Sequence, residues 1–164
     1  MKKGSRVLID TNAIIEAHRL GCWKNLIAFF SMETVQECLR ESATGRCDTY
    51  GYVPIDIQLL RQTITIHSIN DKNRTRLLLS EPEAADLDAG EKDLLAFAIT
   101  QSVDVILICS PDRACMRVAA KLGLLDRLVS LESLSSRVGR QKLKFEFNFT
   151  KQWHKKACDD ILFG

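Results

Sequence analysis

The sequence lacks a long apolar run, a large excess of one charge and a closely spaced cysteine pair. No apolar stretch approaches the roughly 18 residues of a membrane-spanning helix, so we expect no membrane partner. The 23 basic and 21 acidic residues leave a net charge of +2, so any binding to nucleic acid must depend on local patches. Residues 1–5 lead directly into an apolar run, and we therefore expect no signal peptide.

The cysteines show neither a zinc motif nor a disulfide framework. The chain has six of them: Cys22, Cys38, Cys47, Cys109, Cys115 and Cys158. Several lie inside apolar runs, where a reduced cysteine behaves as a small hydrophobic residue. A chain of 164 residues that is 46% apolar buries about two-thirds of its unfolded surface without covalent staples. The composition thus predicts one reduced, cytoplasmic domain over residues 1–164 without structural zinc.

In the first half of the chain, short apolar runs alternate with helical periodicity. The predicted elements are a strand at 6–9, two short helices or one broken helix over 13–30, a helix over 31–41 that starts at Ser31 or Glu33, and a strand at 63–67. Residues 42–54 contain two glycines and a proline and predict a surface excursion. Residues 70–88 are polar around a short apolar island and receive no predicted structure.

The second half continues the alternation. Its predicted elements are a helix over 90–99, a buried strand at 103–108, a helix over 113–122 closed by Gly123, and a last strand at 128–131. Helices and strands that alternate with short connections predict an α/β fold around a mainly parallel sheet.

The tail, residues 141–164, mixes aromatic with basic side chains, and Phe145, Phe147 and Phe149 alternate as in a strand. It could stack bases and contact phosphates, pack on the core as a strand and helix, or form a dimer or partner surface. Packing or partner contacts are the favoured interpretation.

Two predicted strands are followed by acids. Asp10 directly follows the first strand, and Asp112 comes shortly after the strand at 103–108. Ligands of α/β proteins gather beyond the carboxyl ends of parallel strands, so these positions are suited to a site. Each acid also has a simpler interpretation, since Asp10 and Asp112 can cap helices, Glu91 can face a helix dipole and Glu37 can be a solvated charge. A shared site therefore depends on whether the acids converge.

Four stretches in this order resemble the PIN domain, a family of metal-dependent ribonucleases that includes toxins of many type II toxin–antitoxin pairs. They are residues 7–12 (VLIDTN), 34–37 (TVQE), 90–98 (GEKDLLAFA) and 105–112 (VILICSPD). The resemblance covers roughly residues 6–131 and leaves 141–164 as a C-terminal extension. It implies a three-layer α/β/α fold with a central, mainly parallel sheet.

The resemblance also implies roles for individual residues. The catalytic carboxylates that bind Mg²⁺ or Mn²⁺ would be Asp10, Glu37, Glu91 and Asp112, with Asp93 as a secondary metal ligand. Residues two apart on a helix point about 200° apart, so Glu91 and Asp93 are not both expected at one ion. The groups that bond the carboxylates or the scissile phosphate would be Thr11, Asn12 and Ser110. The Ser-Pro-Asp sequence at 110–112 departs from the Thr-x-Asp pattern of the family but keeps the hydroxyl.

The expected activity is hydrolysis of RNA phosphodiester bonds by a metal-activated water, without a covalent enzyme intermediate. The expected partners are an RNA substrate and, as further candidates, an antitoxin protein and a second copy of the chain. An alternative is a catalytically inactive PIN-like module that binds RNA or protein. A phosphohydrolase with a second aspartate two residues after the first is disfavoured, because position 12 is Asn. The three histidines, His18, His67 and His154, show no ligand spacing.

Overall fold

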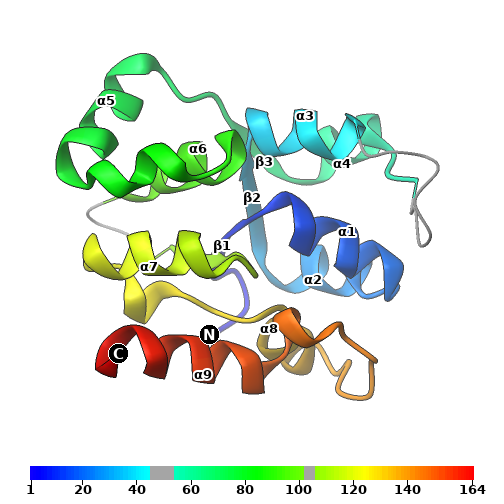
Figure 1. Cartoon of the computed structure of the whole chain (residues 1–164). Helices are drawn as coiled ribbons and strands as arrows, with labels where there is room; N and C mark the ends of the chain where they lie inside the picture. Colours follow the sequence, from blue (N-terminus) through cyan, green and yellow to red (C-terminus); the bar gives the residue numbers. More distant parts are fainter. Residues whose placement is uncertain (45–53, 102–105) are drawn as a thin grey trace.

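A sheet of four parallel strands forms the centre of the computed structural model, which describes residues 1–44, 54–101 and 106–164 (Figure 1). The strands are β1 (Arg6–Ile9), β2 (Ser31–Val35), β3 (Thr65–His67) and β4 (Leu107–Cys109). Their order across the sheet is β3-β2-β1-β4, and every pairing is parallel. The predicted α/β class with a parallel sheet is confirmed.

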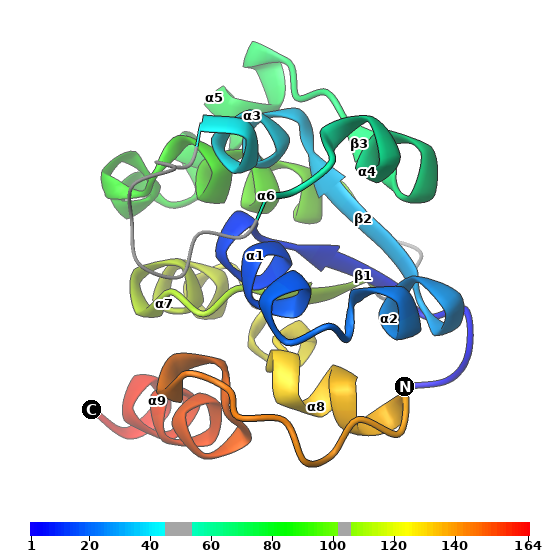
Figure 2. The same cartoon turned by 90° about the vertical axis from the view of Figure 1, so that its right-hand side faces the viewer.

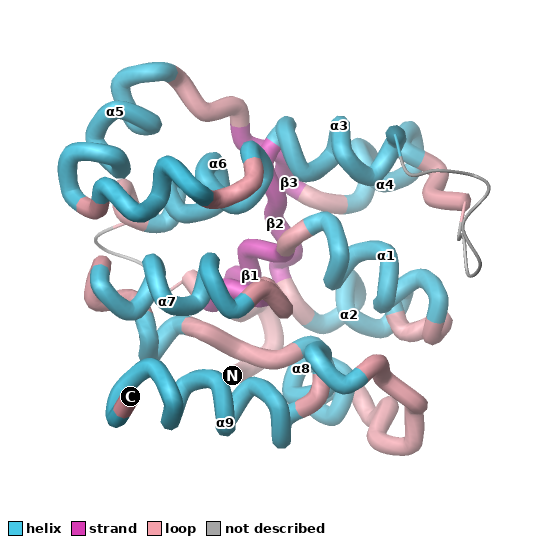
Figure 3. Tube along the Cα trace, in the orientation of Figure 1, coloured by secondary structure: helices cyan, strands magenta, loops and turns pink. Residues whose placement is uncertain are grey.

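Helices cover both faces of this sheet. They are α1 (Thr11–Arg19), α2 (Trp23–Phe29), α3 (Gln36–Thr44), α4 (Ile57–Thr63), α5 (Asp71–Ser80), α6 (Ala89–Ala98), α7 (Arg113–Lys121), α8 (Leu131–Arg137) and α9 (Lys151–Phe163), with 3-10 turns η1 (Pro82–Asp86), η2 (Leu125–Arg127) and η3 (Phe147–Phe149). In Figure 1, α5, α6 and α7 lie on one side of the strands, and α1 to α4 lie on the other. The tube in Figure 3 shows the same three layers, with the strands between the helices.

The first strand is buried on both faces because its side chains alternate between two cores. Val7 and Ile9 pack with residues of α1, α2 and α8, whereas Leu8 packs with residues of α6 and α7. All three side chains are fully buried. A continuous apolar run of this kind is what a central parallel strand requires. The prediction made from residues 6–9 is confirmed.

The predicted helix over residues 31–41 is wrong in its first half. Residues Ser31–Val35 form the strand β2, and the helix α3 begins only at Gln36. Val35, Cys38 and Leu39 are apolar at helical spacing and are buried. However, β2 pairs with β1 on one side and with β3 on the other, and these nonlocal hydrogen bonds decide its conformation.

Residues 70–88, for which no structure was predicted, form α5 and η1. Asn70 caps α5, since its side chain accepts a hydrogen bond from the backbone N–H of Asn73. The predicted strand at 63–67 is shorter than expected, because Thr63 still belongs to α4. Residues 42–44 of the predicted excursion belong to α3, residues 45–53 lie outside the described residues, and Pro54 is exposed and outside any helix or strand.

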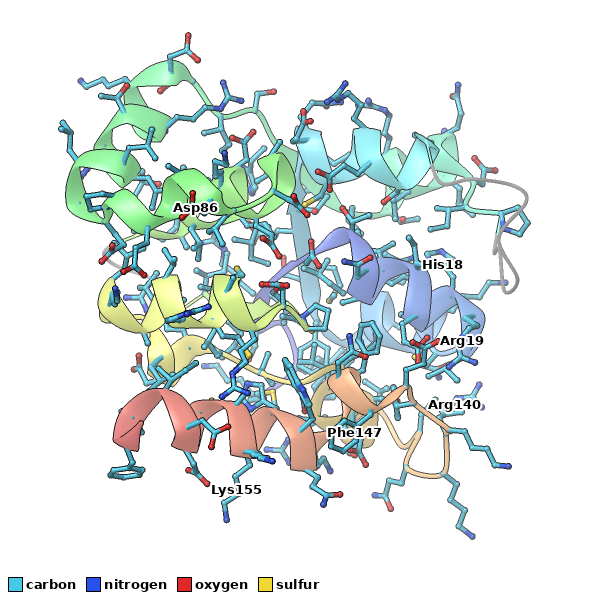
Figure 4. The ribbon with its side chains drawn as sticks, in the orientation of Figure 1. His18, Arg19, Asp86, Arg140, Phe147 and Lys155 are labelled. Carbon is cyan, nitrogen blue, oxygen red and sulfur yellow. The ribbon has the colours of Figure 1, made fainter. Side chains whose placement is uncertain are left out.

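The C-terminal region differs from its prediction. The alternating phenylalanines do not form a strand, because Phe147–Phe149 is a 3-10 turn that leads into α9. Phe149 is buried, while Phe147, which is labelled in Figure 4, is 60% exposed. The expected strand at 128–131 is a single bridge between Ile108 and Leu128. Because Trp153 and Ala157 pack into the core, the part of the tail that forms α9 is a packing element.

Two smaller expectations concern cysteines and membranes. Cys22, Cys38, Cys109 and Cys115 are buried free thiols, and Cys158 is a partly buried one, whereas Cys47 lies outside the described residues. None of the helices in the described ranges combines the length and the apolar character that a bilayer span needs.

Candidate functional site

The carboxyl ends of β1, β2 and β4 lie side by side and lead into the predicted site residues. Asp10 directly follows β1, α3 directly follows β2, and Ser110 directly follows β4. The backbone N–H of Asp10 donates to the carbonyl of Cys109 at 3.0 Å, which ties the ends of two of these strands together. Figures 1 and 2 show the first turns of α1, α3, α6 and α7 arranged around this edge of the sheet.

Asp10 is the most enclosed acid of this region. It is 2% exposed, and its Oδ2 is one of two buried side-chain oxygen or nitrogen atoms without a hydrogen-bond partner among the described residues. Burial raises the pKa of Asp10 from 3.8 to about 7. Repulsion from Glu41 and Asp112 adds to this rise, and the backbone N–H groups of Thr11 and Asn12 oppose it. A carboxylate in this environment is unfavourable without a cation beside it.

Glu91 approaches the same place from the start of α6. Its side chain accepts a hydrogen bond from the backbone N–H of Asp88 at 3.3 Å, which forms part of a capping box. Burial, together with the charges of Asp112 and Asp10, raises its pKa to about 8. The helix-start interpretation of Glu91 is confirmed, and the capping geometry also leaves its carboxylate within the electrostatic influence of Asp112 and Asp10.

Asp112 is a charged neighbour of both acids, since its charge raises the pKa of Asp10 and of Glu91. Its Oδ1 accepts a hydrogen bond from the backbone N–H of Cys115 at 2.9 Å and so caps α7. Ser110 is buried, and its hydroxyl oxygen accepts the backbone N–H of Asp112 at 3.3 Å. The serine thus orients the turn that carries this carboxylate, and the proline between them is accommodated.

Glu37 and Asp93 are engaged elsewhere. Glu37 forms an ion pair with Arg40 on its own helix, while the buried Asp93 accepts two hydrogen bonds from Arg74, at 2.7 and 2.9 Å. The two acids share a recess of about 270 Å³ with Arg74 and Lys92. Each of them already has a guanidinium group as its counter-charge. The structure gives these two predicted metal ligands structural partners of their own.

Glu41, one helical turn after Glu37, is the residue that sequence reasoning missed. Its Oε2 lies 2.9 Å from the hydroxyl oxygen of Thr11, and its Oε1 accepts the backbone N–H of Gly90 at 3.1 Å. Its charge also raises the pKa of Asp10. The sequence offers one signal for it, since residues 37 and 41 lie on the same face of a helix.

The remaining predicted residues take different positions. Thr11 is buried, and its hydroxyl lies within hydrogen-bond distance of the Glu41 carboxylate and of the Cys38 carbonyl. Asn12 is exposed on the first turn of α1, where it is accessible to a ligand. The histidines pack: His18 stacks on Trp23, for example.

The donor chemistry of the site suits a hard divalent cation, because Asp10, Glu91 and Asp112 offer only carboxylate oxygens. The orphaned Oδ2 of Asp10 and the mutual repulsion of these acids are further observations that a cation would account for. Within the described ranges, no three His, Cys, Asp or Glu side chains are already gathered at ligating distance. Binding of an ion would therefore require these side chains to move closer together.

Comparison of the sequence with models of known protein families and with curated proteins found no match.

Proposed function

We propose that this protein is a Mg²⁺- or Mn²⁺-dependent ribonuclease of PIN type that hydrolyses RNA phosphodiester bonds. The observation that carries the proposal is Asp10: a buried carboxylate at the end of a central strand, with an unpartnered oxygen and with Glu91 and Asp112 as charged neighbours. A buried polar atom without a partner calls for an explanation, and an ion is a common one.

In this proposal Asp10, Glu91 and Asp112 would hold the ion. The bound ion would lower the pKa of a water molecule and stabilise negative charge at the scissile phosphate. Ser110 would keep Asp112 oriented through the turn that it stabilises, and the exposed amide of Asn12 would hydrogen-bond a phosphate oxygen. The capping bond from Asp88 would hold the Glu91 carboxylate at the start of α6.

A row of cations next to the site supports an RNA substrate. Arg113, Arg117 and Lys121 are exposed, lie four residues apart on α7 and line a groove of about 520 Å³ between α7 and α9. The row begins at the residue after Asp112. Arg113 pairs with Asp160, and Lys121 pairs with Glu83. Phosphates of a bound strand would compete for these cations.

The test is cleavage of a mixed RNA pool by the purified protein in Mn²⁺, in Mg²⁺ and in EDTA. Asp10→Asn keeps the shape of the side chain but removes its charge, and it should abolish metal-dependent cleavage. Asp126→Asn is the matched control, since it removes one negative charge from an exposed residue on η2, beyond the far end of α7. Cleavage that survives Asp10→Asn would contradict the proposal, and RNA binding without cleavage would instead favour the inactive binding module.

A toxin role within this function has its own experiment. Induced expression of the wild-type chain in a bacterial host should stop growth, and Asp10→Asn should relieve the arrest. Unimpaired growth at equal protein levels would argue against a toxin role but would not contradict the proposed nuclease activity.

A further inference from the structure

Glu41 lies between two helix starts that each carry a proposed metal ligand. The first is the start of α1, where Thr11 follows Asp10, and the second is the start of α6, where Gly90 precedes Glu91. The hydroxyl of Thr11 is 2.9 Å from one oxygen of Glu41, and the backbone N–H of Gly90 is 3.1 Å from the other. One carboxylate on α3 thus connects the immediate neighbours of two ligands that are far apart in the sequence.

The close approach of α6 to α3 places Gly90 directly against the carboxylate of Glu41. A Cβ atom there would lie 2.5 Å from Oε2 of Glu41 and 3.0 Å from both its Cδ and the sulfur of Cys38. Gly90 lies within the first turn of α6 and is not one of the glycines with positive φ among the described residues. What position 90 requires is therefore space for Glu41 and not an unusual backbone conformation.

The charge of Glu41 adds to the negative charge already present beside Asp10. Asp10 is itself buried and is also repelled by Asp112. A neutral side chain that hydrogen-bonded Thr11 and Gly90 would tie the helices together without this repulsion. A cation bound between these acids would turn their repulsion into attraction.

We infer that Glu41 is a positioning residue that sets the separation of the Asp10 and Glu91 carboxylates for metal binding. It does so through the hydroxyl of Thr11 and the backbone N–H of Gly90. This inference rests on the proposed function, because Asp10 and Glu91 are ligands only if the site takes a metal. Groups that orient ligands in this way typically change metal affinity about 10- to 100-fold when they are lost.

Three variants of the full chain test it, with Mn²⁺ alone as the probe and calorimetric titration as the measurement. Glu41→Gln keeps the volume of the side chain and removes its charge, and its NH₂ cannot accept the proton of the Thr11 hydroxyl as the carboxylate does. Gly90→Ala keeps the Glu41 charge and displaces the carboxylate. Thr11→Val removes the hydrogen bond between the Thr11 hydroxyl and Glu41 without a change in charge. Each variant should weaken Mn²⁺ binding about tenfold or more.

Thermal unfolding in EDTA identifies the folded variants, and Asp126→Asn serves as the charge-matched control with wild-type affinity. Affinity equal to wild type in folded Thr11→Val or Gly90→Ala would overturn the inference, even if Glu41→Gln binds weakly, because Glu41 would then act by its charge alone. If Asp10→Asn binds Mn²⁺ as well as the wild type does, or if neither binds it, the proposed function itself is contradicted. Wild-type binding with unaffected variants refutes only the role of Glu41.

Discussion

Replacement of Asp10 by asparagine should stabilise the metal-free protein at alkaline pH, although it should abolish activity. Burial raises the pKa of this carboxyl from 3.8 to about 7, so the folded chain holds the proton more tightly than the unfolded chain does. Stability therefore falls as the pH rises from about 4 to about 7, and the full cost of the buried charge persists above that range. Asparagine does not ionise and carries no such cost.

The magnitude follows from the difference of about three pKa units, which corresponds to about 4 kcal/mol of unfolding free energy. In EDTA, Asp10→Asn should gain up to about 4 kcal/mol over the wild type at roughly pH 8.5, and little at roughly pH 4. Urea unfolding at several pH values measures both curves. Mn²⁺ should then offset much of this difference, since an ion at about 100 times its Kd stabilises the binding-competent wild type by about 2.7 kcal/mol and leaves Asp10→Asn unchanged.

Equal stability of the two proteins in EDTA at alkaline pH would refute this reasoning, because it would mean that the Asp10 charge is not costly where it is buried. An Asp10→Asn variant that is less stable than the wild type only at alkaline pH would refute it more strongly. The charge would then be compensated within the folded chain by a group other than a metal.

Three further predictions concern ion pairs and the basic row. Asp93→Asn should lower stability by about 1–3 kcal/mol in EDTA, because it removes the counter-charge of the half-exposed Arg74; an effect seen only with Mn²⁺ would show that Asp93 holds the ion instead. Glu33→Ala should lower the free energy of unfolding by about 2–4 kcal/mol in chemical denaturation, since the buried Glu33 accepts two hydrogen bonds from Arg6. In the wild type this contribution should weaken at acid pH, because those bonds hold the pKa of Glu33 below its usual value. Arg117→Glu should weaken RNA binding in EDTA and reduce its salt dependence, and an unchanged salt slope would remove α7 from the substrate path.

The central strand could be predicted from the sequence because its signal is local. Val7, Leu8 and Ile9 are apolar in a row, and only a strand covered on both faces buries all three at once. The strand β2 could not be predicted in the same way, because Glu33 interrupts its apolar pattern. Arg6, on the neighbouring strand β1, forms an ion pair with Glu33 and so compensates for the burial of its charge.

The acids near the site were predictable in part. Asp10, Glu91 and Asp112 follow strands or start helices, and these positions can be read from sequence. The choice between Glu37 and Glu41 could not be made, since residues four apart occupy the same helix face and spacing alone does not say which turn lies nearer Asp10. The pairing of Asp93 also depends on α5, a helix in the segment for which the sequence predicted no structure.

The junction between β2 and α3 contains no connecting residue, since the strand ends at Val35 and the helix begins at Gln36. The directions in which the side chains of α3 point are therefore set by the register of β2 in the sheet. One inserted residue at this junction would rotate the helix by about 100°. Glu41 would leave the starts of α1 and α6, while Cys38 and Leu39 would leave the two separate cores into which they pack. At this junction the number of residues constrains the site as tightly as the identity of its acids.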